Sequence, residues 1–115
     1  MRPRSAKAKG KRLQNKVTDL LREKYRNVLE EGDFKSTTMG EHGMDVQLSP
    51  AARKKFPFAI ECKNQESINI WNCLKQAEDN SEGLTPLLIF KRNKTKIYAA
   101  LELTDFLELL DGNKE

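Results

Sequence analysis

The chain has 115 residues, of which 37% are hydrophobic and 33% are charged, with 21 Lys+Arg against 17 Asp+Glu. This length allows one domain with a modest core, and apolar runs that recur throughout the chain argue against full disorder. Its apolar runs are too short for a membrane-spanning helix or a secretion signal, and 2 Cys with 1 His argue against a disulfide scaffold or a zinc site.

The positive charge is concentrated at the N-terminus. Residues 1–26 hold ten Lys or Arg and two acidic residues, whereas the remaining 89 residues hold 11 basic and 15 acidic groups. Residues 1–9 are poor in apolar side chains, so we expect a disordered basic arm there. A basic arm that leads into a basic helix suits a phosphate backbone, although a solvated tail has the same composition.

A helical pattern begins at Gly10. Apolar residues recur three and four positions apart from Leu13 onward, which predicts an amphipathic helix that the Gly32-Asp33 pair ends. Gln14 lies at the edge of its apolar stripe.

Strands are expected next. A short strand is predicted at residues 34–38, and the strict alternation of residues 44–48 predicts a second strand with Asp45 on its polar face. Residues 51–55 are interpreted as a basic loop, and residues 56–63 as a third strand.

A second helix is predicted at residues 70–80, with Trp71 in the core or a dimer interface. The apolar run at residues 87–90 predicts a buried strand, and a turn at residues 91–94 joins it to a hairpin partner at residues 97–101.

The last predicted element is a short helix over residues 105–110, with Thr104 as its N-cap and Gly112 at its end. The expected organisation is one domain over residues 10–111, followed by a tail at residues 112–115. The fold class is α/β, with a mixed central sheet flanked by helices.

Three charged residues on neighbouring predicted strands suggest chemistry. Glu61 and Lys63 lie two positions apart, so both project to one face, and Asp45 lies on the polar face of the preceding strand. If the strands pair, two carboxylates and an amine converge, which suits a hard divalent cation and hydrolysis of a phosphodiester. The alternative is an ordinary solvated sheet face.

The order of these residues and elements resembles the PD-(D/E)XK nuclease superfamily, especially small Holliday-junction resolvase-like nucleases of archaea and phages. The residues that carry the resemblance are Gly43-Met44-Asp45, Ile60-Glu61-Cys62-Lys63 and a following helix with Gln76. The resemblance implies a restriction-endonuclease-like αβββαβ core, extended here by a C-terminal strand and a short helix. It also implies that Asp45 and Glu61 bind Mg²⁺, with Mn²⁺ as a substitute, and that Lys63 positions or activates the attacking water.

Further site residues follow from the same resemblance. Gln14 takes the place of a Glu that resolvases offer near the metal, which leaves the number of ions open. A Ser or Thr near the metal corresponds to Ser36, Thr37 or Thr38, with Ser36 as our choice, and Gln76 is a further candidate.

The expected function is a Mg²⁺-dependent, structure-specific DNA endonuclease that resolves four-way junctions in recombination. Symmetric cleavage of a junction implies a homodimer, and the expected location is the cytoplasm of a prokaryotic or phage-infected cell. The alternatives are a general or nicking nuclease of the same fold on other branched or single-stranded DNA, and a non-catalytic basic DNA-binding module. The expected DNA-binding residues are Lys9, Lys11, Arg12, Lys16, Arg53, Lys54, Lys91 and Arg92.

Overall fold

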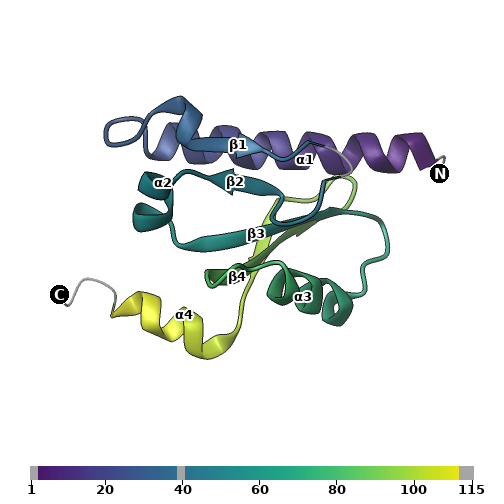
Figure 1. The fold of residues 1–115 in the computed structure, drawn as a ribbon. Coiled ribbons are helices and arrows are strands. Elements are labelled where there is room, and N and C mark those ends of the chain that lie inside the picture. The colour runs from purple at the N-terminus through teal and green to yellow at the C-terminus, as the bar shows by residue number, and fades with distance from the viewer. Residues whose placement is uncertain (1–2, 39–40, 112–115) are drawn as a thin grey trace.

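In the computed structural model, which describes residues 3–38 and 41–111, helices lie on both sides of the strands. Helix α1 runs along one side, and α3 and α4 lie on the other (Figure 1). The elements in chain order are α1 (Pro3–Lys24), the 3-10 helix η1 (Glu31–Asp33), β1 (Phe34–Ser36), β2 (Val46–Leu48), α2 (Pro50–Lys55), β3 (Phe58–Asn64), α3 (Ile70–Asp79), β4 (Thr85–Lys91), β5 (Tyr98–Ala100) and α4 (Leu103–Leu110).

Helix α1 differs from its prediction at both ends. It begins at Pro3, so residues 3–9, which we expected to be a disordered arm, form its first turns. Proline is favoured at the first helical position, and the Ala, Lys and Arg that follow are strong helix formers. The helix ends at Lys24, before the predicted stop at Gly32, and turns lead from there to η1. Residues 1–2 of the predicted arm and the tail at 112–115, with the predicted helix end at Gly112, lie outside the described residues.

The core lies between α1 and the strands. Leu13, Val17 and Leu21 recur along one face of α1 and are buried in one cluster with Phe34 and Ile60. This packing fixes the position of α1 over β3, which places the polar side chains at the edge of the α1 stripe above the same strand.

The strands form two sheets rather than the single mixed sheet that we predicted. β1 and β2 pair in an antiparallel manner, and a separate sheet has the order β3-β4-β5, in which β3 and β4 are parallel and β5 is antiparallel to β4. A backbone hydrogen bond from Asp45 N to Ile60 O, of 2.9 Å, links the two sheets. Asp45 lies directly before β2, so this hydrogen bond joins the two sheets at the start of β2.

A short helix replaces the predicted basic loop at residues 51–55. Ser49 caps α2 by accepting a hydrogen bond from Ala52 N at 3.0 Å, and Pro50 occupies the first turn. Ser at the N-cap and Pro directly after it are the usual start signals of a helix, which accounts for a helix where a loop was predicted.

Two features of the C-terminal half also correct the predictions. Glu102, not Thr104, is the N-cap of α4, because its carboxylate accepts a hydrogen bond from Asp105 N at 2.9 Å. Trp71 is 80% exposed, which contradicts a place in the core. Over residues 3–38 and 41–111, no helix has the length and hydrophobicity needed to cross a membrane.

Candidate active site

A cavity of about 250 Å³ brings together most of the predicted site residues. It lies between α1, the segment before β2, the second half of β3, and α3 at Gln76. Asp45, Glu61 and Lys63 all line it, so the predicted convergence of these three side chains is observed. The complete lining is Lys7, Gly10, Lys11, Gln14, Asp45, Glu61, Cys62, Lys63 and Gln76.

Asp45 is held in position by the backbone of β3. Gly43, with a φ of 103°, turns the chain into Met44 and Asp45, a conformation that glycine adopts at little cost. The Asp45 carboxylate Oδ2 then accepts a hydrogen bond of 2.7 Å from Cys62 N. Burial raises the pKa of Asp45, while this hydrogen bond and the nearby amines of Lys63 and Lys11 act to lower it.

The surroundings of Glu61 in the cavity disfavour the charged form of its carboxyl. It is 4% exposed, and its Oε1 is buried without a hydrogen-bond partner among the described residues. Burial, together with the negative charge of Asp45, raises the pKa of Glu61 to about 7. A buried carboxylate with an oxygen that lacks a partner is costly, so this pair of acids favours either a proton or a cation.

Lys63 lies beside this pair. Its Nζ is 3.8 Å from Glu61 Oε2, and its side chain is 22% exposed. Because the two residues alternate with Cys62 along β3, both side chains project to the same face of the sheet. The amine therefore stands at the cavity with partial access to solvent, where it can donate hydrogen bonds to a bound molecule.

Gln14 reaches the cavity from α1 with its amide fixed. Its Nε2 donates hydrogen bonds to Ser36 Oγ at 2.8 Å and Thr37 O at 2.7 Å. Lys11 Nζ donates to the same two oxygens, at 3.1 and 2.8 Å. The oxygen of the Gln14 amide is then the atom that can bind a cation. Compared with the Glu that the family resemblance leads one to expect at this place, Gln14 keeps an oxygen ligand but lacks the negative charge.

Ser36 does not line the cavity. Its hydroxyl accepts the hydrogen bonds from Gln14 and Lys11, so it anchors residues that do. Thr37 is buried, and its Oγ1 donates a hydrogen bond of 2.5 Å to Met44 O, whereas Thr38 is exposed. None of these three hydroxyls reaches the two carboxylates.

Helix α3 contributes one predicted and one missed residue. Gln76 lines the cavity from an exposed position. Asn80, the C-cap of α3, donates a side-chain hydrogen bond to Glu61 that acts to lower the pKa of that carboxyl. Its spacing of four residues from Gln76 places both on one face of the helix, a signal that could have identified Asn80.

Comparison with known proteins identifies a family for this chain. The model of a family described as "phage putative PDDEXK endonuclease" matches residues 5–114. The chain belongs to this phage PDDEXK endonuclease family. No curated protein and no solved structure gave a significant match. Membership therefore supports a nuclease of the PD-(D/E)XK superfamily, and it leaves the substrate and the metal to be argued from the site.

The basic residues of this PDDEXK chain are spread over several surfaces. On α1, Arg12 and Lys16 are exposed, whereas Lys11 is turned into the cavity and the carbonyl of Lys9 accepts a hydrogen bond from Asn64. On α2, Arg53 pairs with Glu82 at 2.9 Å and Lys54 is exposed. Lys91 and Arg92 lie at a different cavity, away from the carboxylates.

The donor set fits a hard divalent cation. Two carboxylates line one cavity, one carboxylate oxygen among the described residues is buried without a partner, and Gln14, which carries an amide oxygen, lines the same cavity. Oxygen ligands of this kind, completed by water, are those that Mg²⁺ prefers. Among the described residues no cluster of three or more His, Cys, Asp or Glu is present, so Gln14 is the most suitable third protein ligand.

Proposed function

We propose that this PDDEXK family member is a Mg²⁺-dependent endonuclease that hydrolyses phosphodiester bonds in branched DNA, with the four-way junction as its substrate. The observation that carries the proposal is the cavity shared by Asp45, Glu61 and Lys63, in which Glu61 Oε1 is buried without a partner. A cation in this cavity would give that oxygen its missing partner and offset the repulsion between the two carboxylates.

Asp45 and Glu61 would hold the ion, and Gln14 would complete the protein ligands through its amide oxygen. The ion would supply positive charge to the scissile phosphate and lower the pKa of the attacking water. The hydrogen bond from Cys62 N orients the Asp45 carboxylate before any ion binds, which reduces the reorganisation that binding requires.

Lys63 would act on the water and the phosphate. Its amine can hold the water by a hydrogen bond and stabilise the negative charge that develops on the phosphate oxygens. The water oxygen would then attack phosphorus and give up a proton to solvent, one phosphoester P–O bond would break, and the leaving oxygen would take up a proton from solvent. Burial of the neighbouring carboxylates strengthens these interactions, because charges interact more strongly away from bulk water.

Recognition of DNA would rest on the phosphate backbone. Arg12 and Lys16 are exposed on α1, and Lys7 and Lys11 of the same helix line the cavity. Contacts of this kind read the shape of DNA rather than its sequence and weaken steeply as salt increases. Symmetric cleavage of a junction needs two active sites related by a two-fold axis, so the proposal includes a homodimer.

The test is a cleavage assay on a labelled four-way junction, with matched linear duplex and single strand, in Mg²⁺ or EDTA. Wild type is compared with Lys63→Ala and with Lys75→Ala, which removes an exposed lysine of α3. We expect paired cuts on the junction that require Mg²⁺, are lost in Lys63→Ala and persist in Lys75→Ala. Cleavage of every substrate would reduce the proposal to a general nuclease, and binding without cleavage would favour a DNA-binding module.

A further inference from the structure

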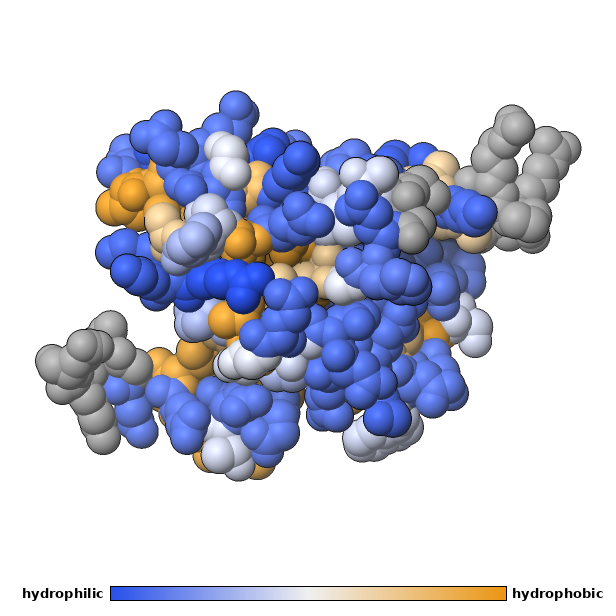
Figure 2. All heavy atoms as spheres, in the orientation of Figure 1, coloured by the Kyte–Doolittle hydropathy of each residue, from blue (hydrophilic) through white to orange (hydrophobic). Residues whose placement is uncertain are grey.

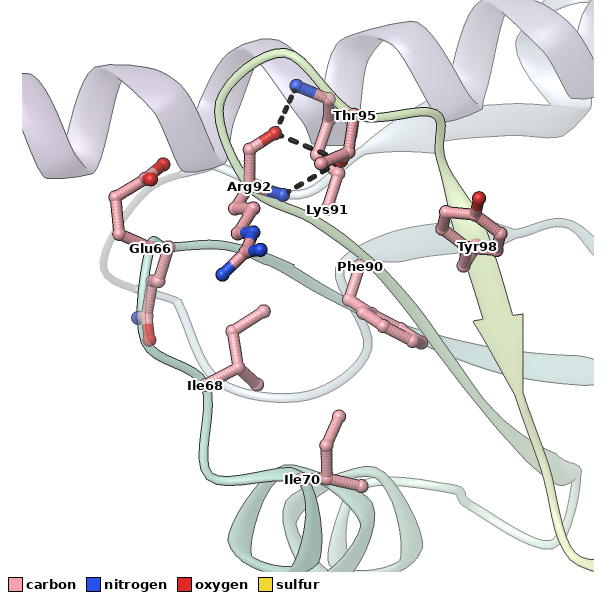
Figure 3. Close-up of a pocket in the computed structure, with 9 residues that line it drawn as sticks. Glu66, Ile68, Ile70, Phe90, Lys91, Arg92, Thr95 and Tyr98 are labelled. Atoms are coloured by element: carbon pink, nitrogen blue, oxygen red, sulfur yellow. Dashed lines mark hydrogen bonds between the residues drawn. The ribbon is translucent and has the colours of Figure 1, made fainter.

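A second cavity, of about 310 Å³, lies on the α3 side of the three-stranded sheet. Figure 3 shows four apolar side chains around it: Ile68 before α3, Ile70 at the start of α3, Phe90 of β4 and Tyr98 of β5. The rings of Phe90 and Tyr98 lie 6.2 Å apart between their centroids. We call this cavity, with its four apolar side chains, the apolar groove.

Helix α4 presents an apolar stripe of its own. Leu103, Phe106, Leu107 and Leu110 recur at the i, i+3, i+4, i+7 spacing that defines one helix face, and they are 67%, 43%, 49% and 68% exposed. None of the residues of α4 is buried. Figure 2 shows hydrophobic atoms at the surface along this helix, on a face that is otherwise largely hydrophilic.

The charges around the groove are mainly basic, and those around the stripe are acidic. Lys91 ends β4, the segment after it carries Arg92, Lys94 and Lys96, and Glu66 is the one acidic residue of the groove lining. Arg92 reaches over the groove near Ile68 (Figure 3). Helix α4 and its cap carry Glu102, Asp105 and Glu108 and no basic residue. A basic rim beside one apolar surface and acidic residues beside the other make the two surfaces electrostatically complementary.

The stripe does not cover the groove of its own chain. Residues 101–102 alone connect β5 to α4, and in Figure 1 the helix leads away from α3 and from the segment that precedes it. Such a short connection prevents α4 from turning back over Tyr98, which lies on the strand directly before it. Within residues 3–38 and 41–111, the groove and the stripe are therefore both left uncovered.

We propose that the occupant is a second copy of this chain, in a two-fold dimer in which α4 of each copy lies in the apolar groove of the other. Two reciprocal contacts of this kind would remove the stripe and the groove of both copies from water at once, as expected when an exposed apolar patch marks an interface. The reciprocal arrangement places each acidic helix against a basic rim. Trp71, exposed beside Ile70 of the groove, adds an aromatic side chain of the kind that interfaces favour.

This inference does not depend on nuclease activity, because it rests on surfaces remote from Asp45 and Glu61. Its test measures molar mass by sedimentation in metal-free buffer, and so its failure is separate from a failure of cleavage. We expect wild type to sediment as a dimer, and Lys63→Ala to do the same. A monomeric wild type at the concentrations used for cleavage would overturn the proposal.

Charge reversal makes the test specific to the proposed contact. Arg92→Glu with Lys94→Glu reverses the basic rim, and Asp105→Lys with Glu108→Lys reverses the acidic side of α4. We expect each double variant to weaken the dimer roughly tenfold or more, and an equimolar mixture to recover it as a heterodimer in which both reciprocal contacts again pair opposite charges. A matched control, Glu78→Lys with Asp79→Lys on the exposed side of α3, should leave the dimer unchanged.

Two further results would overturn the contact. A dimer that survives both charge reversals uses another surface, and two weakened variants that fail to recombine contradict the reciprocal arrangement. Leu107→Ser provides an uncharged check, because it removes one side chain from the stripe and should also weaken the dimer. Far-ultraviolet circular dichroism and thermal unfolding of each variant establish that it remains folded.

Discussion

The carboxylate cavity and the α4 surface each place side chains in an unfavourable environment, but the two environments are opposite. In the cavity, the acids Asp45 and Glu61 are taken out of water, and Glu61 Oε1 lacks a partner. On α4, leucines that are half to two-thirds exposed are left in water. Burying charge and exposing apolar surface both raise the free energy of the chain.

The difference between the two regions lies in what would relieve each cost. A small cation satisfies buried oxygens, whereas only an extended apolar surface covers a leucine stripe. Hydrogen bonds also hold the carboxylate of Asp45 and the amide of Gln14 in place in the cavity. Helix α4, by contrast, is joined to β5 by only two residues. The comparison predicts that substitutions in the cavity change the response to cations and that substitutions on α4 change association.

The largest expected effect comes from Asp45→Asn. The substitution keeps the shape of the side chain but removes the charge that would hold the ion, so we expect cleavage to fall by about 10³-fold. It should also abolish any increase of the melting temperature in Mg²⁺. Asp79→Asn, an exposed carboxylate on α3, should keep both. Cleavage that survives in Asp45→Asn would assign the ion to other residues.

The next effect concerns stability and pH in the absence of metal. Burial raises the pKa of Glu61 to about 7 from an ordinary 4.5, so the folded state binds its proton more tightly than the unfolded state. The stabilisation is complete below pH 4.5 and is lost as the pH rises through 7. We therefore expect Glu61→Gln to be more stable than wild type at pH 8, by up to about 3 kcal/mol, and nearly equal to it at pH 4.5.

Denaturant unfolding across this pH range, with Glu78→Gln as an exposed control, measures the effect of Glu61. Added Mg²⁺ should reverse the order of stability at pH 8, because wild type gains from binding and Glu61→Gln does not. Parallel pH profiles for the two proteins would show that Glu61 is not the group whose proton stabilises the fold.

A smaller effect is expected from Gln14→Glu. The substitution places a third carboxylate at the cavity, so divalent cations should bind about tenfold more tightly, while stability without metal should fall because like charges are brought together. Isothermal titration with Mg²⁺ and Mn²⁺ measures the affinity. Asn15→Asp makes the same change of charge at the next position on the exposed side of α1 and should leave binding unaltered; an equal gain there would indicate a general electrostatic effect.

The smallest effect is expected on the stability of the monomer when the α4 surface is changed. Leu107 is 49% exposed, so Leu107→Ser should alter the free energy of unfolding by about 0.5 kcal/mol or less at concentrations where the chain is monomeric. Phe34→Ala, at a fully buried position, should instead cost about 3–5 kcal/mol. A large loss in Leu107→Ser would mean that α4 packs within its own chain.

The sequence was most informative where local patterns decide the structure. The alternation of residues 44–48 and 56–63 placed Glu61 and Lys63 on one face, because successive side chains in a strand alternate. Apolar residues at helical spacing located most of α1 and α3, and a continuous apolar run located β4. Start signals were misjudged in α2, where Ser49 and Pro50 begin a helix, and in α4, where the carboxylate of Glu102 reaches the free backbone N–H groups before Thr104 can.

By itself, the sequence determined the order of the elements other than η1 and α2, the shared face of Glu61 and Lys63 and the concentration of basic residues in α1. Only the tertiary structure decided that the strands divide into two sheets, that Ser36 supports Gln14 instead of reaching the carboxylates, and that Glu61 is buried without a full set of partners. Hydrogen bonds and capping act over a few residues and leave a local pattern. Burial and charge proximity depend on segments that are distant in the chain, and no local pattern records them.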